Sequence, residues 1–302
     1  MKTLISIVGT TGIGKTKLAI DLAKILDTEI VSCDSRQFFR DMEIGTAAPT
    51  QQEMSSVKHH FVGNLSVVND YSIGKFEVDA LEKINELFSK KDTVIMVGGS
   101  MMYEKAVLVG LNDLPEANEE NQQKLQAVLS EKGMEGLRRI LAELDPIYFE
   151  KVDIDNPRRL LRAIDVIWQT GKKYSELIKT PTHKRNFNVI RIGIAAPREI
   201  IYEKINDRVM KMMENGLLQE VENLLPYQDL QSLKTVGYTE LFKYLNGEWE
   251  LEFAVSEIQK NSRRFAKRQL TWYRKEEDIN WVDYQNSYQE SLSLLQQFNI
   301  KI

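Results

Sequence analysis

The stretch GTTGIGKT has the residue types and spacing of a loop that binds phosphate groups. Its glycines permit a tight turn whose backbone N–H groups point at an anion, and a helix that starts after the loop adds the positive end of its dipole. Lys15 would neutralise phosphate oxygens, and the Thr16 hydroxyl would bind Mg²⁺. The predicted loop residues are Gly9, Thr10, Thr11, Gly12, Ile13, Gly14, Lys15 and Thr16. Taken alone, the loop suggests ATP.

The chain lacks the acidic residue with which a later strand ends in phosphate-loop ATPases. In those enzymes a later apolar strand ends in an Asp that supports magnesium and the attacking water. Here the apolar run Thr93 to Val97 is followed by Gly98, Gly99 and Ser100. The sequence therefore favours a transferase, in which something other than water attacks, over a motor or a helicase.

Asp34, in the segment CDSRQFF, is a candidate general base. It follows a predicted strand and would lie on the same edge of the sheet as the phosphate-binding loop. A carboxylate there can accept a proton from an incoming nucleophile within hydrogen-bond reach. An isolated Asp often only caps a turn, but the polar neighbours Ser35, Arg36 and Gln37 favour a binding site.

Two segments place basic residues on one face of a predicted helix. They are Arg158, Arg159 and Arg162 in the first segment, and Lys260, Arg263, Arg264, Lys267, Arg268 and Arg274 in the second. Either face alone is compatible with a solvated surface. Beside a phosphate-binding loop they favour a polyanionic second substrate, because guanidinium groups suit phosphates. The residues thus predict a phosphate-loop transferase with a nucleic acid as candidate acceptor.

The elements that must position these residues alternate between strands and helices. Apolar runs predict strands at residues 4–8, 29–34, 93–99 and 189–195, and helical periodicity starts at Lys15. Such alternation indicates a parallel sheet that binds ligands at the carboxyl ends of its strands. The predicted fold is α/β: a P-loop NTPase-like parallel sheet covered by helices, with a helical insertion. Residues 1–111 form the first part of the core, 112–181 the insertion that contacts the acceptor, and 182–302 the rest of the core with the C-terminal basic helix.

Composition limits the class of protein further. The 302 residues are 42% hydrophobic, with a formal net charge of −4, which argues against general coating of nucleic acid but permits a local basic surface. Cys33 is the only cysteine, which excludes a disulfide framework and a zinc ribbon. No apolar run approaches the roughly 20 residues that a membrane span needs. We expect a cytoplasmic monomer without membrane association.

Seven segments, in this order, closely resemble the tRNA dimethylallyltransferases, also called tRNA isopentenyltransferases. They are GTTGIGKT, SCDSRQ, DMEIGTAAP, GGSMMY, NPRRLLRAI, KTVGYTEL and AKRQLTWYR, and together they span nearly the whole chain. SCDSRQ and AKRQLTWYR are far more specific to the family than the loop. With no C-terminal zinc finger after the last segment, the sequence resembles the bacterial form.

The resemblance implies that the bound diphosphate belongs to dimethylallyl diphosphate. The exocyclic amine of the adenosine 3′ of the tRNA anticodon would attack the allylic carbon, and diphosphate would leave. By match to the family motifs, Asp34 is the general base, Thr16 assists Mg²⁺, and Ser100 contacts the diphosphate or the amine. Arg208, in YEKINDRVMKMM, matches the arginine that binds the departing diphosphate.

The same resemblance implies contacts with the tRNA anticodon stem-loop. The predicted tRNA-binding residues are Asp34, Ser35, Arg36, Gln37, Ser100, Gln122, Arg158, Arg159, Leu160, Leu161, Arg162, Leu233, Lys234, Thr235, Val236, Gly237, Tyr238, Lys267, Arg268, Gln269, Leu270, Thr271, Trp272, Tyr273 and Arg274. Ser100 stands where the family usually has Thr, and Gln122 stands where bacterial relatives have an arginine. The pair His59 and His60 matches the family without the usual acidic residue after it, and we interpret the pair as structural.

Three other functions stay open at this point. An adenylate isopentenyltransferase acting on free AMP or ATP would share the loop and the base but would not need two basic faces. A small-molecule kinase would use ATP with Asp34 as its base. A tRNA-binding protein without activity would not need Lys15, Asp34 and Arg208.

Overall fold

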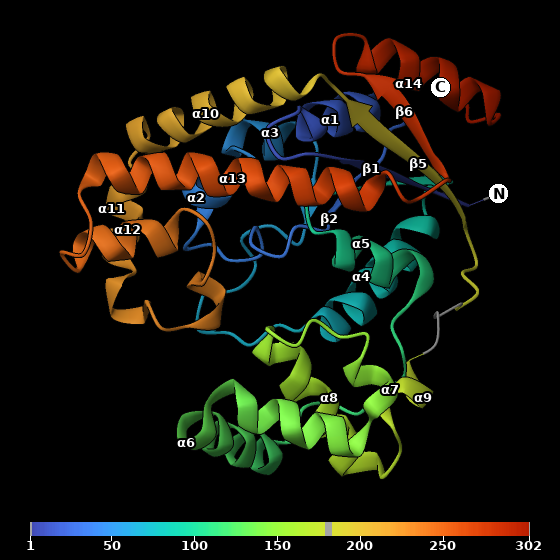
Figure 1. Ribbon diagram of the computed structural model, residues 1–302. Coiled ribbons are helices and arrows are strands. Elements are labelled where there is room, and N and C mark those ends of the chain that lie inside the picture. The colour runs from blue at the N-terminus through green and yellow to red at the C-terminus, as the bar shows by residue number, and fades with distance from the viewer. Residues whose placement is uncertain (1, 179–182, 302) are drawn as a thin grey trace. The chain divides into compact units, whose positions relative to one another are not determined.

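The computed structural model describes residues 2–178 and 183–301, and its central element is a six-stranded parallel sheet (Figure 1). The strand order is β3-β2-β4-β1-β5-β6. The strands are β1 (Thr3–Gly9), β2 (Ile30–Ser32), β3 (His59–His60), β4 (Thr93–Val97), β5 (Asn188–Ala195) and β6 (Ile279–Asp283). Because β2, β4 and β1 are adjacent and parallel, the segments that follow them emerge at one edge of the sheet.

Helices cover both faces of the sheet. On one face, Ile5 and Ile7 of β1 belong to a core that includes α1 (Lys15–Ile25), α10 (Arg198–Glu214) and α14 (Ser287–Gln297). On the other face, Leu4 belongs to a core with α4 (Ile73–Phe88) and α5 (Met101–Val109). Strands buried on both faces have continuous apolar sequences, which is why the central strands could be predicted.

A buried ion pair fixes the start of α5 against the sheet. Glu104 accepts hydrogen bonds at Oε1 and Oε2 from the Nε and Nη2 of Arg191, at 3.0 and 3.1 Å, and a third from Ser6 at 2.8 Å. Burial raises the pKa of Glu104 in spite of Arg191. The paired geometry holds the first turn of α5 over β1 and β5, just after the turn that contains Ser100.

A third group of helices packs beside the sheet, and its helix α13 runs alongside α10 (Figure 1). Its members are α2 (Glu43–Thr46), α11 (Leu217–Asn223), the short 3₁₀ helices η1 (Leu225–Tyr227) and η2 (Gln231–Leu233), α12 (Tyr238–Leu245) and α13 (Leu251–Tyr273). The short helix α3 (Gln51–Ser56) follows α2 and has no buried residue. Buried Tyr238 donates to Glu220 at 2.6 Å, and the same carboxylate accepts the backbone N–H groups of Ile44 and Gly45. These contacts hold α2 in place.

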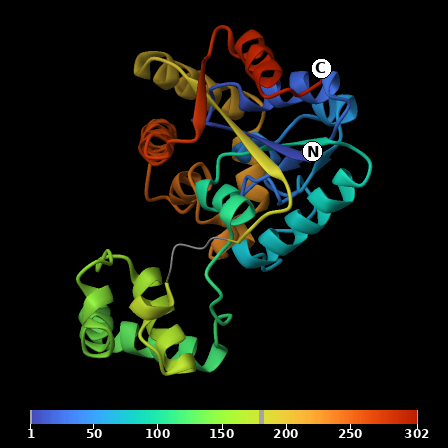
Figure 2. The ribbon, with the colours of Figure 1, turned by 90° about the vertical axis from the view of Figure 1, so that its right-hand side faces the viewer.

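Residues Val109–His183 form a second compact unit with its own core, distinct from the unit of Met1–Leu108 and Lys184–Ile302. Its helices are α6 (Glu119–Leu144), α7 (Pro146–Phe149), α8 (Pro157–Thr170) and α9 (Tyr174–Leu177), visible in Figure 2. Leu137, Leu141, Leu160 and Ile164 form the α6–α8 interface. The predicted insertion of residues 112–181 stays a prediction, and its end at residue 181 lies outside the described residues.

The structure departs from the predicted elements at two strands. β3 has two residues, and β6 is an edge strand with exposed side chains, so neither has the apolar pattern of a buried strand. In β3, His60 pairs with Glu29 at 2.7 Å, and His59 Nδ1 lies 2.8 Å from the carbonyl of Val57. Within residues 2–178 and 183–301, no helix is long and apolar enough to cross a membrane, and no group of three His, Cys, Asp or Glu side chains could hold a metal.

Candidate active site

The predicted phosphate-binding loop connects β1 to α1 in the geometry that anion binding requires. Gly9, Gly12 and Gly14 have φ angles of 141°, 79° and 109°, a region that favours glycine. Gly14 is the N-cap of α1 and provides no side-chain cap. The first N–H groups of this helix of 11 residues are therefore available to an anion.

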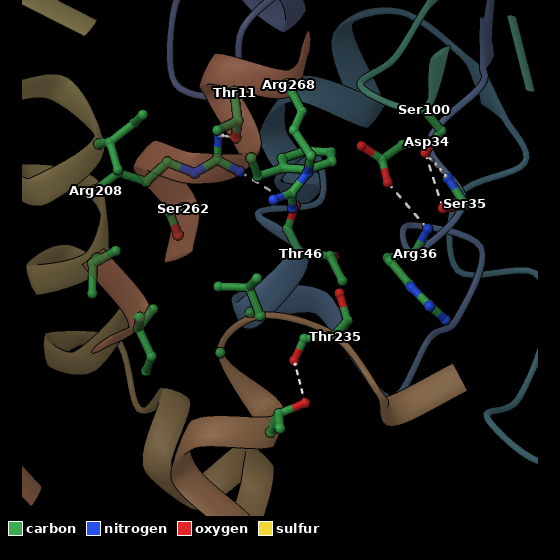
Figure 3. A pocket seen from close by; sticks show the side chains of 18 of the residues that line it. Thr11, Asp34, Ser35, Arg36, Thr46, Ser100, Arg208, Thr235, Ser262 and Arg268 are labelled. Carbon is green, nitrogen blue, oxygen red and sulfur yellow. Dashed lines mark hydrogen bonds between the residues drawn. The ribbon is translucent and has the colours of Figure 1, made fainter. Parts of the chain in front are cut away.

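Two cationic side chains converge on the loop. Lys15 donates from Nζ to the carbonyl of Thr10 at 2.8 Å. Arg208, from α10, donates to Thr11 Oγ1 at 3.2 Å and to the carbonyl of Thr46 at 3.3 Å (Figure 3). Burial and the nearby Arg208 lower the pKa of Lys15 to about 8, although Asp34 acts in the opposite direction. Burial also lowers the pKa of Arg208. Two cations near one carboxylate make the space favourable for a multivalent anion.

Asp34 lies directly beyond β2, and hydrogen bonds of the neighbouring segments orient it. Its Oδ1 accepts the backbone N–H of Arg36 at 3.1 Å. Ser100 Oγ accepts the N–H of Ser35 and donates to Ser35 Oγ, both at 2.9 Å. Figure 3 shows Asp34, Ser35 and Ser100 on one side of a cavity, with Arg208 and Thr11 on another. The strand ends thus hold a carboxylate and a hydroxyl across from the cations.

Two cavities of different chemistry share Thr11, Asp34, Arg208 and Phe265. One has a volume of about 420 Å³, and its lining includes Gly12, Gly14, Lys15, Thr16, Gln37 and His59. The other has a volume of about 630 Å³, and its apolar lining includes Met101, Met102, Tyr103, Ile205, Val209 and Met212. The site therefore suits a substrate with an anionic end and an apolar part, with its junction beside Asp34.

The structure brings together most of the residues predicted for the chemical step. The loop residues Thr11, Gly12, Gly14, Lys15 and Thr16 line the smaller cavity, while Gly9, Thr10 and Ile13 form its supporting turn. Ser100 and the segment from Lys234 to Gly237 line the larger cavity, but Leu233 and Tyr238 are buried in the core. Arg36 lines it too and also donates to the carbonyl of Ser232 at 2.8 Å.

The predicted tRNA-binding residues of α13 divide between surface and interior. Lys267, Arg268, Thr271 and Arg274 are exposed, whereas Leu270 and Trp272 are half-buried. Gln269 and Tyr273 are buried, so their side chains do not lie on the surface. The helical period explains the division, because residues three and four apart share a face.

In the second unit, Arg158 and Arg159 are exposed on α8, and Gln122 is half-buried on α6. Leu160 and Leu161 belong to the hydrophobic core of this unit. Arg162 donates from Nη2 to the carbonyl of Pro115 at 2.6 Å, a contact that holds the chain before α6. Arg158 and Arg159 thus lie on the surface of this unit, where a polyanion could reach them. Leu160, Leu161 and Arg162 instead stabilise the helix and the chain before α6.

Sequence reasoning missed Phe265 and the segment from Gly45 to Thr50. Phe265 is not among the predicted site residues, yet it lines both cavities. Gly45 and Thr46 line the larger cavity, and Ala47 to Thr50 line the smaller one. The run of small residues in GTAAP was a usable signal, since small side chains leave room for a ligand beside the backbone.

The fold and the site define an α/β protein with a phosphate-binding loop and no strand-end acid after β4, a class suited to group transfer. The family model described as IPP transferase matches residues 37–276. The tRNA dimethylallyltransferases of Christiangramia forsetii and Flavobacterium johnsoniae are each 47% identical, over 93% and 96% of both chains respectively. The chain belongs to the tRNA dimethylallyltransferase family, which confirms the resemblance of its motifs.

Solved structures agree with this assignment. The tRNA isopentenylpyrophosphate transferase of Bacillus halodurans has a TM-score of 0.72 at 33% identity, over 99% of this chain and 95% of that one. A eukaryotic dimethylallyltransferase acting on tRNA has a TM-score of 0.82 at 25% identity, over 100% and 81%. The predicted P-loop NTPase-like fold and the prediction of a prenyltransferase enzyme are confirmed.

The lowered pKa of Lys15 predicts that affinity for inorganic diphosphate decreases as the pH rises. Between about pH 7 and pH 9, the protonated fraction of a group with a pKa of about 8 falls from about 90% to about 10%, so the affinity should fall about tenfold. Titration calorimetry measures this change. Lys15→Met has no titrating amine, so its profile reports only the ionisation of diphosphate. Parallel profiles for the two proteins would contradict the prediction.

Proposed function

We propose that the chain transfers the dimethylallyl group from dimethylallyl diphosphate to the exocyclic amine of the adenosine 3′ of the anticodon in tRNAs. It acts in the cytoplasm as a monomer and releases diphosphate. Family membership supports a prenyl donor and a tRNA acceptor. The observation that carries the proposal is the junction of the two cavities, where Asp34 and Arg208 line both the phosphate side and the apolar side.

The smaller cavity fits the leaving group. When the allylic C–O bond breaks, negative charge grows on the diphosphate and positive charge on the five-carbon group. Lys15, Arg208 and the N–H groups at the start of α1 already surround this cavity. Donors that are fixed in advance stabilise charge as it develops, without reorganisation during the reaction.

Asp34 is suited to accept the proton that the amine loses. The amine nitrogen forms the new N–C bond and must then lose a proton, which the carboxylate can accept from the larger cavity. Arg36 N–H, bonded to Oδ1, restricts the rotation of the carboxyl group. Ser100 and Ser35 hold the adjacent backbone. Since the amine is the nucleophile, no acid is needed after β4 to activate water.

The chemistry of the smaller cavity also suits Mg²⁺. Mg²⁺ prefers oxygen ligands and is often held by few protein groups together with substrate phosphates. Thr16, Asp34 and Glu53 line this cavity, and within the loop Thr10 Oγ1 is buried without a hydrogen-bond partner among the described residues. We propose that Thr16 and the diphosphate hold Mg²⁺, which would neutralise leaving-group charge.

The larger cavity fits an adenine that has left the anticodon stack. A base must be flipped out before its amine can be reached. The lining combines Tyr103, Met102 and Phe265 with the polar groups of Arg36, Thr235 and Arg268, which suits an aromatic base joined to a sugar-phosphate backbone. The exposed Lys267 on α13, and the exposed Arg274 directly after this helix, would contact that backbone.

An adenylate isopentenyltransferase and a small-molecule kinase share the loop and the carboxylate. Relatives at 47% identity have names that specify tRNA, which favours neither alternative. A kinase lacks support as well, because these relatives are named for the transfer of a dimethylallyl group and not of a phosphate group.

Labelled dimethylallyl diphosphate tests the proposed function. Transfer of label to an anticodon stem-loop RNA with adenosine at the position 3′ of the anticodon, and release of one diphosphate per transfer, are the expected results. An RNA with guanosine there, and free AMP, are the controls and should stay unlabelled. Labelling of AMP alone would replace the proposal with the adenylate enzyme, and transfer of phosphate from ATP would replace it with the kinase.

Replacement of Asp34 by Asn tests the base. The amide keeps the oxygen that accepts Arg36 N–H but cannot take a proton, so kcat should fall roughly 10²–10⁴-fold. Affinities for the stem-loop and for diphosphate, from titration, should stay within a few-fold of wild type. A variant with near-normal turnover would remove Asp34 from the mechanism.

Charge reversal on α13 tests the RNA surface. The double variant Arg264→Glu, Lys267→Glu should weaken stem-loop binding and reduce the slope of log affinity against log salt by about two, because two phosphate contacts are lost. Diphosphate affinity should not change. The matched control reverses Lys24 and Lys90, which are exposed elsewhere on the same unit. If both variants have the same slope of log affinity against log salt, the basic face of α13 is solvated and does not bind RNA.

A further inference from the structure

Gln269 is the buried polar residue on the inner side of α13, with none of its side chain exposed. Its carboxamide makes two hydrogen bonds to different parts of the site. Oε1 accepts the backbone N–H of Thr11 at 2.9 Å, and Nε2 donates to the carbonyl of Gly99 at 2.8 Å. Gln269 thus links the phosphate-binding loop to the end of β4, and its contact with tRNA stays a prediction.

Each end of this link leads to a group with a role in the proposed reaction. Arg208, which lies on the side of the leaving group, donates a hydrogen bond to Thr11 Oγ1. Gly99 precedes Ser100, which is hydrogen-bonded to Ser35 next to Asp34. Hydrogen bonds and the short backbone segments between them thus join the leaving-group side to the base side, with the Gln269 amide at the centre.

Gln269 also lies beside the base itself. A Cβ atom on Gly99 would lie 3.1 Å from Asp34 Oδ2 and 3.1 Å from Gln269 Nε2, so the carboxylate and the amide flank the same small space. The amide presents its N–H₂ group to that space. A carboxylate in its place would put a second negative charge beside Asp34, whose protonation would then be favoured.

We propose that Gln269 is a positioning residue for prenyl transfer, which fixes the loop that binds the leaving group relative to the base. The inference rests on the proposed function, since it assigns the amide a part in that reaction. Its neutral side chain supplies one acceptor and one donor, which Glu or an aliphatic residue of similar size cannot both supply. Misplacement of reacting groups by about 1 Å can cost on the order of 100-fold in rate.

Gln269→Glu tests the proposal, with Gln259→Glu as the matched control. Gln259 is on the same helix and lines neither cavity. In the Gln269 variant, kcat for the stem-loop RNA should fall about tenfold or more, and the acidic limb of the pH–rate profile should move up by about one pH unit. Thr11 N–H keeps its acceptor, but the new carboxylate lines the smaller cavity, so inorganic diphosphate should bind more weakly than to wild type.

A structural role alone would lower the midpoint of urea unfolding without moving the profile, and that result would overturn the proposal. If the Gln269 variant does not fold, Gly99→Ala provides a second test. The methyl group of the new alanine would enter the space between Asp34 and the amide of Gln269. This variant should lower kcat about tenfold or more with KM nearly unchanged, and a wild-type kcat would overturn the proposal. A wild-type chain that binds diphosphate but labels no RNA would instead refute the proposed function.

Discussion

The close approach of two strand ends is the constraint on which the site depends. A Cβ atom on Gly98 would lie 2.5 Å from the carbonyl carbon of Cys33 and 2.6 Å from its sulfur, so this position has no room for any side chain. The residues that follow, Asp34 on one segment and Gly99 and Ser100 on the other, are consequently forced together. The hydrogen bonds between the serines then need little further ordering of the chain.

Helices that arrive later in the chain complete what the strand ends begin. α10 supplies Arg208, and α13 supplies Phe265 and Gln269, from a part of the sequence more than 170 residues beyond Asp34 by numbering. Arg208 and Phe265 line both the cavity that suits an anion and the apolar cavity, and Gln269 lines the first of these. A reaction that separates a diphosphate from a hydrocarbon group benefits from this arrangement, because each product of bond breaking lies against a wall of matching chemistry.

Local sequence patterns were sufficient to predict the central strands, the loop and the position of Asp34. A strand buried on both faces has a continuous apolar sequence, and the phosphate-binding loop has a characteristic glycine spacing. β6 was not predicted, since an edge strand with polar residues has no such mark. The positions of Gln269 and Phe265 could not be predicted, because a helical wheel separates faces without saying which face meets a loop from another part of the chain. Leu160 and Leu161 belong to a motif yet pack inside, so motif membership does not establish exposure.

Methionine makes up much of the apolar wall of the larger cavity, through Met101, Met102 and Met212, and Met102 is 46% exposed. Thioether side chains adapt to differently shaped ligands at small energetic cost. The same atoms are open to oxidants, and conversion to the sulfoxide replaces an apolar surface with a polar, chiral one. Oxidation would therefore change the wall of the larger cavity and leave the phosphate-binding loop, which has no methionine or cysteine, unmodified. Methionine sulfoxide reductases would reverse that change.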